Sequence, residues 1–134
     1  MNNIMKYQRE ALLGVFLAAI SIPFVCLFPK EKQNDLWAIL LVVIASDYIG
    51  FGIMDGRMKQ KLIEIVLCTG FVVLSVLGLW YSTWFLVIGY IAHGIWDYIH
   101  DHRMVMTKIK RWYPPFCMIY DWLIGTWLLY TVIQ

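Results

Sequence analysis

The feature that most constrains the fold is a series of five long apolar segments. They cover residues 12–28, 36–54, 62–80, 83–99 and 116–133, and each is about as long as a helix needs to cross a bilayer core. Only helices satisfy every backbone polar group of such a segment in lipid. Hydrophobic residues make up 61% of the 134 residues and charged residues 15%, which is too much apolar surface for a soluble domain of this size to bury. The sequence therefore predicts one all-α domain, a polytopic integral membrane bundle of five transmembrane helices.

Short polar connections between the segments predict where the helices begin. Asn34 or Asp35 is expected to cap the second span, and Ser82 or Thr83 the fourth, because these side chains accept a hydrogen bond from a free helical N–H group. The Pro114–Pro115 pair is expected to open the fifth span, where the missing N–H group costs nothing.

Lysine and arginine are distributed unevenly along the chain. Nine of the eleven lie in the N-terminal segment and in the loops after the second and fourth spans, whereas only Lys30 and Lys32 lie in the other loops. The positive-inside rule therefore predicts a cytoplasmic N-terminus and an outer C-terminus in a multi-pass protein of the cell membrane. The apolar segments make the lipid bilayer the expected partner. Because there is no long basic tract, we do not expect nucleic acid to be a partner.

A weak internal repeat appears at an offset of 46 residues. Five residues recur there, namely Ile49, Ile53, Asp55, Arg57 and Met58, which correspond to Ile95, Ile99, Asp101, Arg103 and Met104. The match predicts that spans 1–2 and 3–4 are parallel copies of one helical hairpin and that the fifth helix is an addition.

Glycines within the spans indicate close helix packing. They are Gly50, Gly52, Gly89, Gly94 and Gly125. Because small residues let membrane helices approach closely, we expect these positions to form helix contacts and to support a homo-oligomer.

The fourth span carries the densest set of polar residues. His93, Asp97 and His100 are four and three residues apart, so they fall on one stripe of a helix, whereas His102 projects from nearly the opposite side. Two imidazoles and a carboxylate suit a divalent transition metal, with zinc as one candidate. The sequence predicts His93, Asp97 and His100 as metal ligands, alone or in part together with an aspartate of another span.

Two further aspartates, Asp47 and Asp121, lie inside apolar runs of the second and fifth spans. Ionisable groups at membrane depth are expensive and usually functional, so each is a candidate ligand or general base, with Tyr48 or Tyr120 as a candidate proton donor. The three cysteines form no CxxC pair and are expected to be buried apolar side chains rather than ligands. They are Cys26, Cys68 and Cys117.

These residues support several functions. The first is a metal-dependent membrane hydrolase or lipid-modifying enzyme, in which the metal activates water and Asp121 or Asp47 is the base. Basic residues after the fourth span, including Arg103 and Arg111, would hold an anionic lipid headgroup. The alternatives are an oligomeric proton-coupled or divalent-cation transporter or channel subunit and an accessory assembly protein. In a purely structural reading, Asp97 pairs with a histidine of its own helix, and Asp55 pairs with Arg57.

Overall fold

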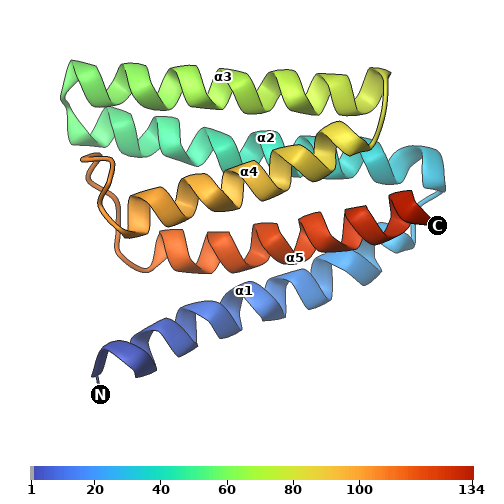
Figure 1. Cartoon of the computed structure of the whole chain (residues 1–134), viewed down its shortest axis with the longest axis horizontal. Coiled ribbons are helices and arrows are strands. Elements are labelled where there is room, and N and C mark those ends of the chain that lie inside the picture. The colour runs from blue at the N-terminus through green and yellow to red at the C-terminus, as the bar shows by residue number, and fades with distance from the viewer. Residues whose placement is uncertain (1) are drawn as a thin grey trace.

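The structure, a computed structural model, is a bundle of five α-helices that run alternately up and down (Figure 1). It describes the backbone of residues 2–134 and the side chains of residues 7–134. The helices are α1 (Asn2–Cys26), α2 (Lys30–Asp55), α3 (Met58–Trp80), α4 (Trp84–Asp101) and α5 (Tyr113–Ile133). The two termini lie at opposite ends of the bundle, which follows from an odd number of alternating helices (Figure 1). The prediction of an all-α helical bundle is confirmed.

Four of the five helices are long and apolar enough to cross a membrane, which indicates a multi-pass membrane protein. They are α1 from Tyr7 onward, α2, α3 and α5. Helix α4 is not among them, although the sequence predicts a fifth span there. It has only 18 residues, and its C-terminal half carries the polar stripe that begins at His93. The helix richest in candidate site residues is therefore the one that length and composition do not mark as a candidate span.

The helix boundaries differ from the predicted ones mainly at α2. This helix begins at Lys30 with Pro29 at its N-cap position, so the prediction of a cap at Asn34 or Asp35 is wrong. The Asn34 amide instead donates a hydrogen bond to the Thr83 hydroxyl at 2.8 Å, which ties α2 to the turn before α4. At the start of α5, two prolines occupy the first positions of the helix as predicted.

The packing order does not follow the order of the chain. Contacts are most extensive between α4 and α5 and between α2 and α3, and α1 packs mainly against α5. The repeat predicts hairpins of α1 with α2 and of α3 with α4 as units, but these two pairs share fewer contacts. Figure 1 shows the consequence, with α1 lying beside α5 at one edge of the bundle and α3 lying beside α2 at the other.

Two glycines permit the closest helix approaches around the polar residues. A Cβ atom at Gly14 would lie 2.6 Å from the backbone oxygen of Phe116, so α1 can cross α5 only at a glycine. A Cβ atom at Gly94 would lie 2.3 Å from the indole nitrogen of Trp122. Of the five glycines expected at helix contacts, only Gly50 faces open space. The others pack within the chain, and the homo-oligomer stays a prediction.

The interior is divided into an apolar end and a polar end. At the end that holds the C-terminus, a single apolar cluster joins α1, α2, α4 and α5, with Leu41, Leu86 and Ile124 fully buried in it. The buried ionisable side chains lie toward the opposite end, where α4 ends and α5 begins. The polar interior is therefore concentrated at one end of the bundle.

Candidate metal centre and its surroundings

Helix α4 turns one continuous stripe toward the bundle interior. His93 and Asp97 are fully buried on it and His100 is 6% exposed, as the spacing of four and three residues predicts. His102 is exposed, and its ring nitrogen Nδ1 lies 3.0 Å from the backbone oxygen of Tyr98 on its own helix. His102 therefore lies on a different side of the helix from His93 and His100, as the spacing predicts.

Four buried side chains from α4 and α5 converge around His93 and form what we call the His93 cluster: His93, Asp97, Cys117 and Asp121. Each can offer one ligand atom such that these atoms all lie within 4.8 Å of one another. His93 Nδ1 lies 2.6 Å from Asp121 Oδ2 and 3.5 Å from Asp97 Oδ2. The Cys117 thiol lies 3.6 Å from Asp121 Oδ2.

Several atoms of the His93 cluster remain without a hydrogen-bond partner among the described residues, although they are buried. They are His93 Nε2, Asp97 Oδ2 and Asp121 Oδ1. Leaving a buried polar atom unpaired is costly, so the concentration of three in one place indicates a site that is built to receive something. The other oxygen of Asp97 is held in place, because it accepts a hydrogen bond from the Tyr48 hydroxyl of α2.

His100 lies in a second cluster, which we call the Glu64 cluster: Gln60, Glu64, Trp96, His100 and Thr107. The fully buried Glu64 carboxylate faces His100 Nε2 at 2.9 Å, the Thr107 hydroxyl at 2.7 Å and the Trp96 indole at 3.3 Å. His100 Nδ1 lies 2.9 Å from the backbone oxygen of Trp96. Both ring nitrogens of His100 thus face oxygen atoms, one of the Glu64 carboxylate and one of the Trp96 backbone.

The structure therefore separates the predicted site residues. It brings His93, Asp97 and Asp121 together. It places His100, which lies one helical turn beyond Asp97, against Glu64. Asp47 lies outside both clusters, where its Oδ2 accepts a hydrogen bond from the Tyr113 hydroxyl at 2.7 Å.

Sequence reasoning missed Glu64 and Cys117, the two members of these clusters that could ligate a metal, as well as Gln60, Trp96 and Thr107 around Glu64. Glu64 lies in the second turn of α3, inside the run Leu-Ile-Glu-Ile-Val-Leu, and a carboxylate so placed carries the same signal that marked Asp47 and Asp121. Cys117 was expected to be merely a buried apolar side chain. It is buried, as expected. Cys117 and Asp121 are also four residues apart, a spacing that puts both side chains on one face of a helix and that indicates a shared site. Cys26 is exposed, so for this cysteine the expectation of burial is wrong.

A narrow groove leads from the side of the bundle toward Cys117. Its volume is about 190 Å³, and its walls come from α1, α2 and α5. Leu17, Leu40 and Ile44 make its lining mostly apolar, whereas Asp47 and Cys117 provide polar groups.

The loop after α4 is fixed across the polar end of the bundle. The Asp55 carboxylate accepts hydrogen bonds from the Arg57 guanidinium at 2.7 and 2.8 Å and from the backbone N–H group of Lys108 at 2.8 Å. The bond to Asp55 raises the pKa of Arg57 above its usual value. The predicted pairing of Asp55 with Arg57 is thus confirmed, and the pair also anchors the loop.

The donor set of the His93 cluster fits a transition metal. Imidazole nitrogen, thiolate sulfur and carboxylate oxygen are the three ligand types of zinc sites. In a tetrahedral site with bonds of about 2.0–2.3 Å, ligand atoms lie about 3.3–3.8 Å apart. The ligand atoms of the four groups lie within 4.8 Å of one another, so the upper limit of their spacing exceeds the tetrahedral value by about 1 Å.

Comparisons with known proteins give one match. The sequence model of a family described as a family of unknown function (DUF6010) matches residues 9–133, which is nearly the whole chain. No curated protein matches the sequence, and no solved structure matches the fold.

Proposed function

The chain belongs to the DUF6010 family, whose function is unknown, and we propose that it is a metal-dependent hydrolase of membrane lipids. The observation that carries the proposal is the His93 cluster. Its four potential ligands from two helices are buried, and three of their polar atoms have no hydrogen-bond partner among the described residues. A divalent metal, with zinc as the best fit to the donors, would satisfy these atoms.

We assign the metal to His93, Asp97 and Cys117. A ligating carboxylate is normally held by a further hydrogen bond, and the Tyr48 hydroxyl supplies one to Asp97. Three protein ligands leave a fourth position for water, as in catalytic zinc sites. The His93 ring also contacts Asp121 at 2.6 Å, which orients it.

Asp121 is then the general base. A metal held by His93, Asp97 and Cys117 would make water a nucleophile at neutral pH. The Asp121 carboxylate, whose Oδ1 has no hydrogen-bond partner among the described residues, would take one proton from that water as the water oxygen adds to the carbonyl carbon of an ester. It would return this proton to the alcohol oxygen as the ester C–O bond breaks. The apolar groove beside Cys117 would take up the acyl chain.

The one-sided distribution of polar residues supports an enzyme over a transporter. A transport path through one chain needs polar groups across the full thickness of the membrane, whereas the other end of this bundle is filled by the buried apolar cluster around Leu41 and Leu86.

The test begins with metal content. We expect wild-type protein purified in mild detergent and supplied with zinc to hold one ion per chain by elemental analysis, and we expect His93→Ala, Asp97→Asn and Cys117→Ser to lose it. His102→Ala is the matched control, because His102 is exposed on the same helix. Absence of bound metal in the folded wild-type protein refutes the proposal.

Activity separates the base from the ligands. Asp121→Asn is expected to keep the metal but to lose release of fatty acid from a lipid extract, measured by mass spectrometry. If Asp121→Asn loses metal together with activity, Asp121 is a ligand rather than the base. Metal binding without any change in the lipid extract refutes the hydrolase.

A further inference from the structure

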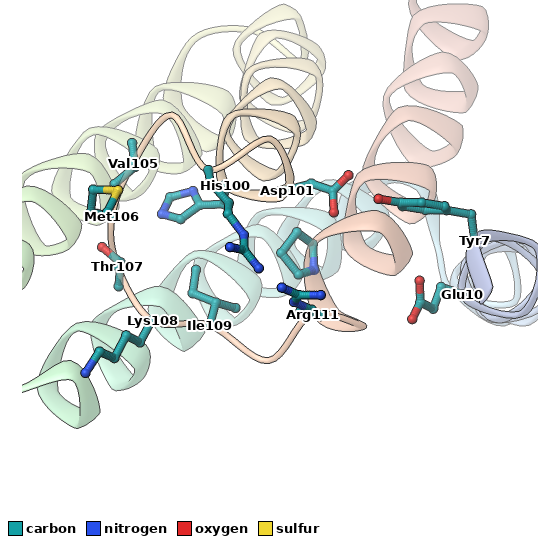
Figure 2. Close-up of a pocket in the computed structure, with 12 residues that line it drawn as sticks. Tyr7, Glu10, His100, Asp101, Val105, Met106, Thr107, Lys108, Ile109 and Arg111 are labelled. Carbon is teal, nitrogen blue, oxygen red and sulfur yellow. The ribbon is translucent and has the colours of Figure 1, made fainter. Parts of the chain in front are cut away.

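A cavity opens at the polar end of the bundle, outside the His93 cluster. Its volume is about 450 Å³, within the range of small-molecule sites. Its walls come from the N-terminal part of α1, the end of α4, the following loop and the start of α5. In Figure 2, Tyr7 and Glu10 project from α1 toward the side of the cavity where Asp101 and Arg111 lie, and Lys108 points away.

Two arginines line this cavity, together with the carboxylates of Glu10 and Asp101. Arg103 and Arg111 both line it, and neither takes part in any ion pair among the described residues. Guanidinium groups bind phosphate oxygens through two parallel hydrogen bonds. The cavity therefore offers a place for a phosphate group at the membrane surface.

The backbone at Arg103 gives independent support. Arg103 has φ 54°, the only positive φ of a non-glycine residue in the described part of the chain. Its N–H group bonds to the oxygen of His100, and that of Met104 to the oxygen of Ile99, which is the helix ending that usually carries glycine at this position. An arginine here costs about 1–2 kcal/mol of backbone strain relative to glycine, so its side chain has a role that outweighs the strain.

The cavity also holds a buried acidic group that lacks a partner. Glu10 lines it and is only 8% exposed, and its Oε2 atom has no hydrogen-bond partner among the described residues. A buried carboxylate is stable only when a cation or hydrogen-bond donor pairs with it. The ligand of this cavity should therefore carry a donor-bearing positive charge as well as a phosphate.

We propose that this cavity binds a phosphate ester that carries a primary ammonium group, namely the headgroup of phosphatidylethanolamine. Arg103 and Arg111 hold the phosphate, and Glu10 accepts hydrogen bonds from the ammonium. The sequence predicted an anionic headgroup on the basis of the basic residues alone, and Glu10 is the residue that changes this expectation.

The position of the cavity relates it to the proposed hydrolase, and the inference rests on that function for its role as a substrate site. His100 lines the cavity and lies seven residues from His93 on the same helix, which is about 10 Å along the helix axis. The acyl esters of a phospholipid lie deeper in the bilayer than its phosphate. A headgroup bound here would thus place its ester bonds toward the His93 cluster.

Native mass spectrometry of the purified protein in detergent tests the binding directly. The probes are short-chain phosphatidylethanolamine, phosphatidylcholine and phosphatidylglycerol of equal chain length, together with soluble phosphoethanolamine. We expect phosphatidylethanolamine to bind at least about tenfold more tightly than the other two lipids, since only its ammonium can donate to Glu10. Equal binding of all three lipids overturns the proposal. If phosphoethanolamine binds as tightly as the lipid, the ligand is a soluble phosphate ester and the lipid assignment is wrong.

Two variants separate the roles of the charged groups. Arg103→Gly is expected to weaken all phospholipids by about tenfold while thermal stability stays equal or rises, because glycine suits the backbone at this position. Glu10→Gln is expected to remove the preference for phosphatidylethanolamine over phosphatidylcholine. Lys110→Ala removes a positive charge from the same loop, at a residue that does not line the cavity, and is expected to change nothing. Unchanged binding by Arg103→Gly, or an unchanged preference in Glu10→Gln, contradicts the proposal.

Failure of this site and failure of the hydrolase are distinguishable. Asp121→Asn leaves the cavity intact and is expected to bind phosphatidylethanolamine like the wild type. If the lipid binds but no metal is found, the headgroup site stands and the hydrolase is wrong. If metal is bound but the three lipids bind alike, the metal centre stands and the headgroup site is wrong.

Discussion

Replacement of Glu64 by alanine tests the least expected part of the interior. Glu64 is fully buried in α3, and its carboxylate receives contacts from His100, Thr107 and Trp96. Glu64→Ala leaves His100 Nε2 and the Trp96 indole without their acceptor, whereas the Thr107 hydroxyl keeps Gln60 Oε1 at 2.9 Å. The change therefore removes contacts that join α3, α4 and the loop after α4.

The expected loss of stability follows from these contacts. A buried polar group left without its partner costs about 1–3 kcal/mol, and here that group is the His100 ring. Hydrogen bonds between membrane helices average about 0.6 kcal/mol, so the bonds from Thr107 and Trp96 add little. We expect Glu64→Ala to lower the free energy of unfolding by about 2–3 kcal/mol and Glu64→Gln by less, because the amide oxygen of glutamine still accepts the bond from Thr107.

Unfolding by SDS in mixed micelles, followed by circular dichroism, measures this loss. A double-mutant cycle with His100→Ala should give a coupling energy of about 2–3 kcal/mol, because the two side chains are in direct contact. His102→Ala is the control and should stay within about 0.5 kcal/mol of the wild type, since His102 is exposed. A loss below about 1 kcal/mol for Glu64→Ala, or additive effects of the two replacements, would refute the reasoning.

Three further predictions concern packing, the metal and orientation. Gly14→Ala should lower the free energy of unfolding by about 1–3 kcal/mol, because its Cβ would lie 2.6 Å from a backbone oxygen of α5. A Cβ at Gly70 meets nothing within 4 Å, so Gly70→Ala should not destabilise the protein. Equal effects of the two replacements would contradict the close crossing of α1 and α5 at Gly14. Tyr48→Phe removes the hydrogen bond to Asp97 and should weaken zinc binding by about tenfold in a chelator competition. An unchanged zinc affinity would contradict the assignment of Asp97 as a ligand. Cysteines placed at Lys32 and Lys59 should be labelled from outside and from inside the cell, respectively, and the reverse result would put the polar end of the bundle outside.

The sequence predicts the helices and the polar stripe of α4 because both depend only on the spacing of residues close together in the chain. Apolar length fixes where helices lie, and a spacing of four and three residues fixes which side chains of α4 face together. The burial of His93 and Asp97 and the exposure of His102 follow directly from this spacing.

The partners of the stripe depend on which helices pack together, and no local pattern gives that. His93 faces Asp121 because α4 lies against α5, whereas His100, two turns further along, meets Glu64 of α3. The predicted grouping of His93, Asp97 and His100 assumes that one stripe makes one site. In the structure the stripe passes two different neighbours and takes part in two clusters.

Helix α4 also has a consequence for how the protein enters the membrane. Helix α4 carries His93, Asp97 and His100 on its buried stripe and is not among the helices marked as candidate spans, and ionisable groups at membrane depth oppose insertion of a helix by itself. We expect its insertion to wait for α5, whose Asp121 pairs with His93, so that the translocation machinery receives α4 and α5 as a pair. Truncation of the nascent chain before α5 should therefore leave α4 outside the bilayer, and glycosylation mapping of such truncated chains would detect it.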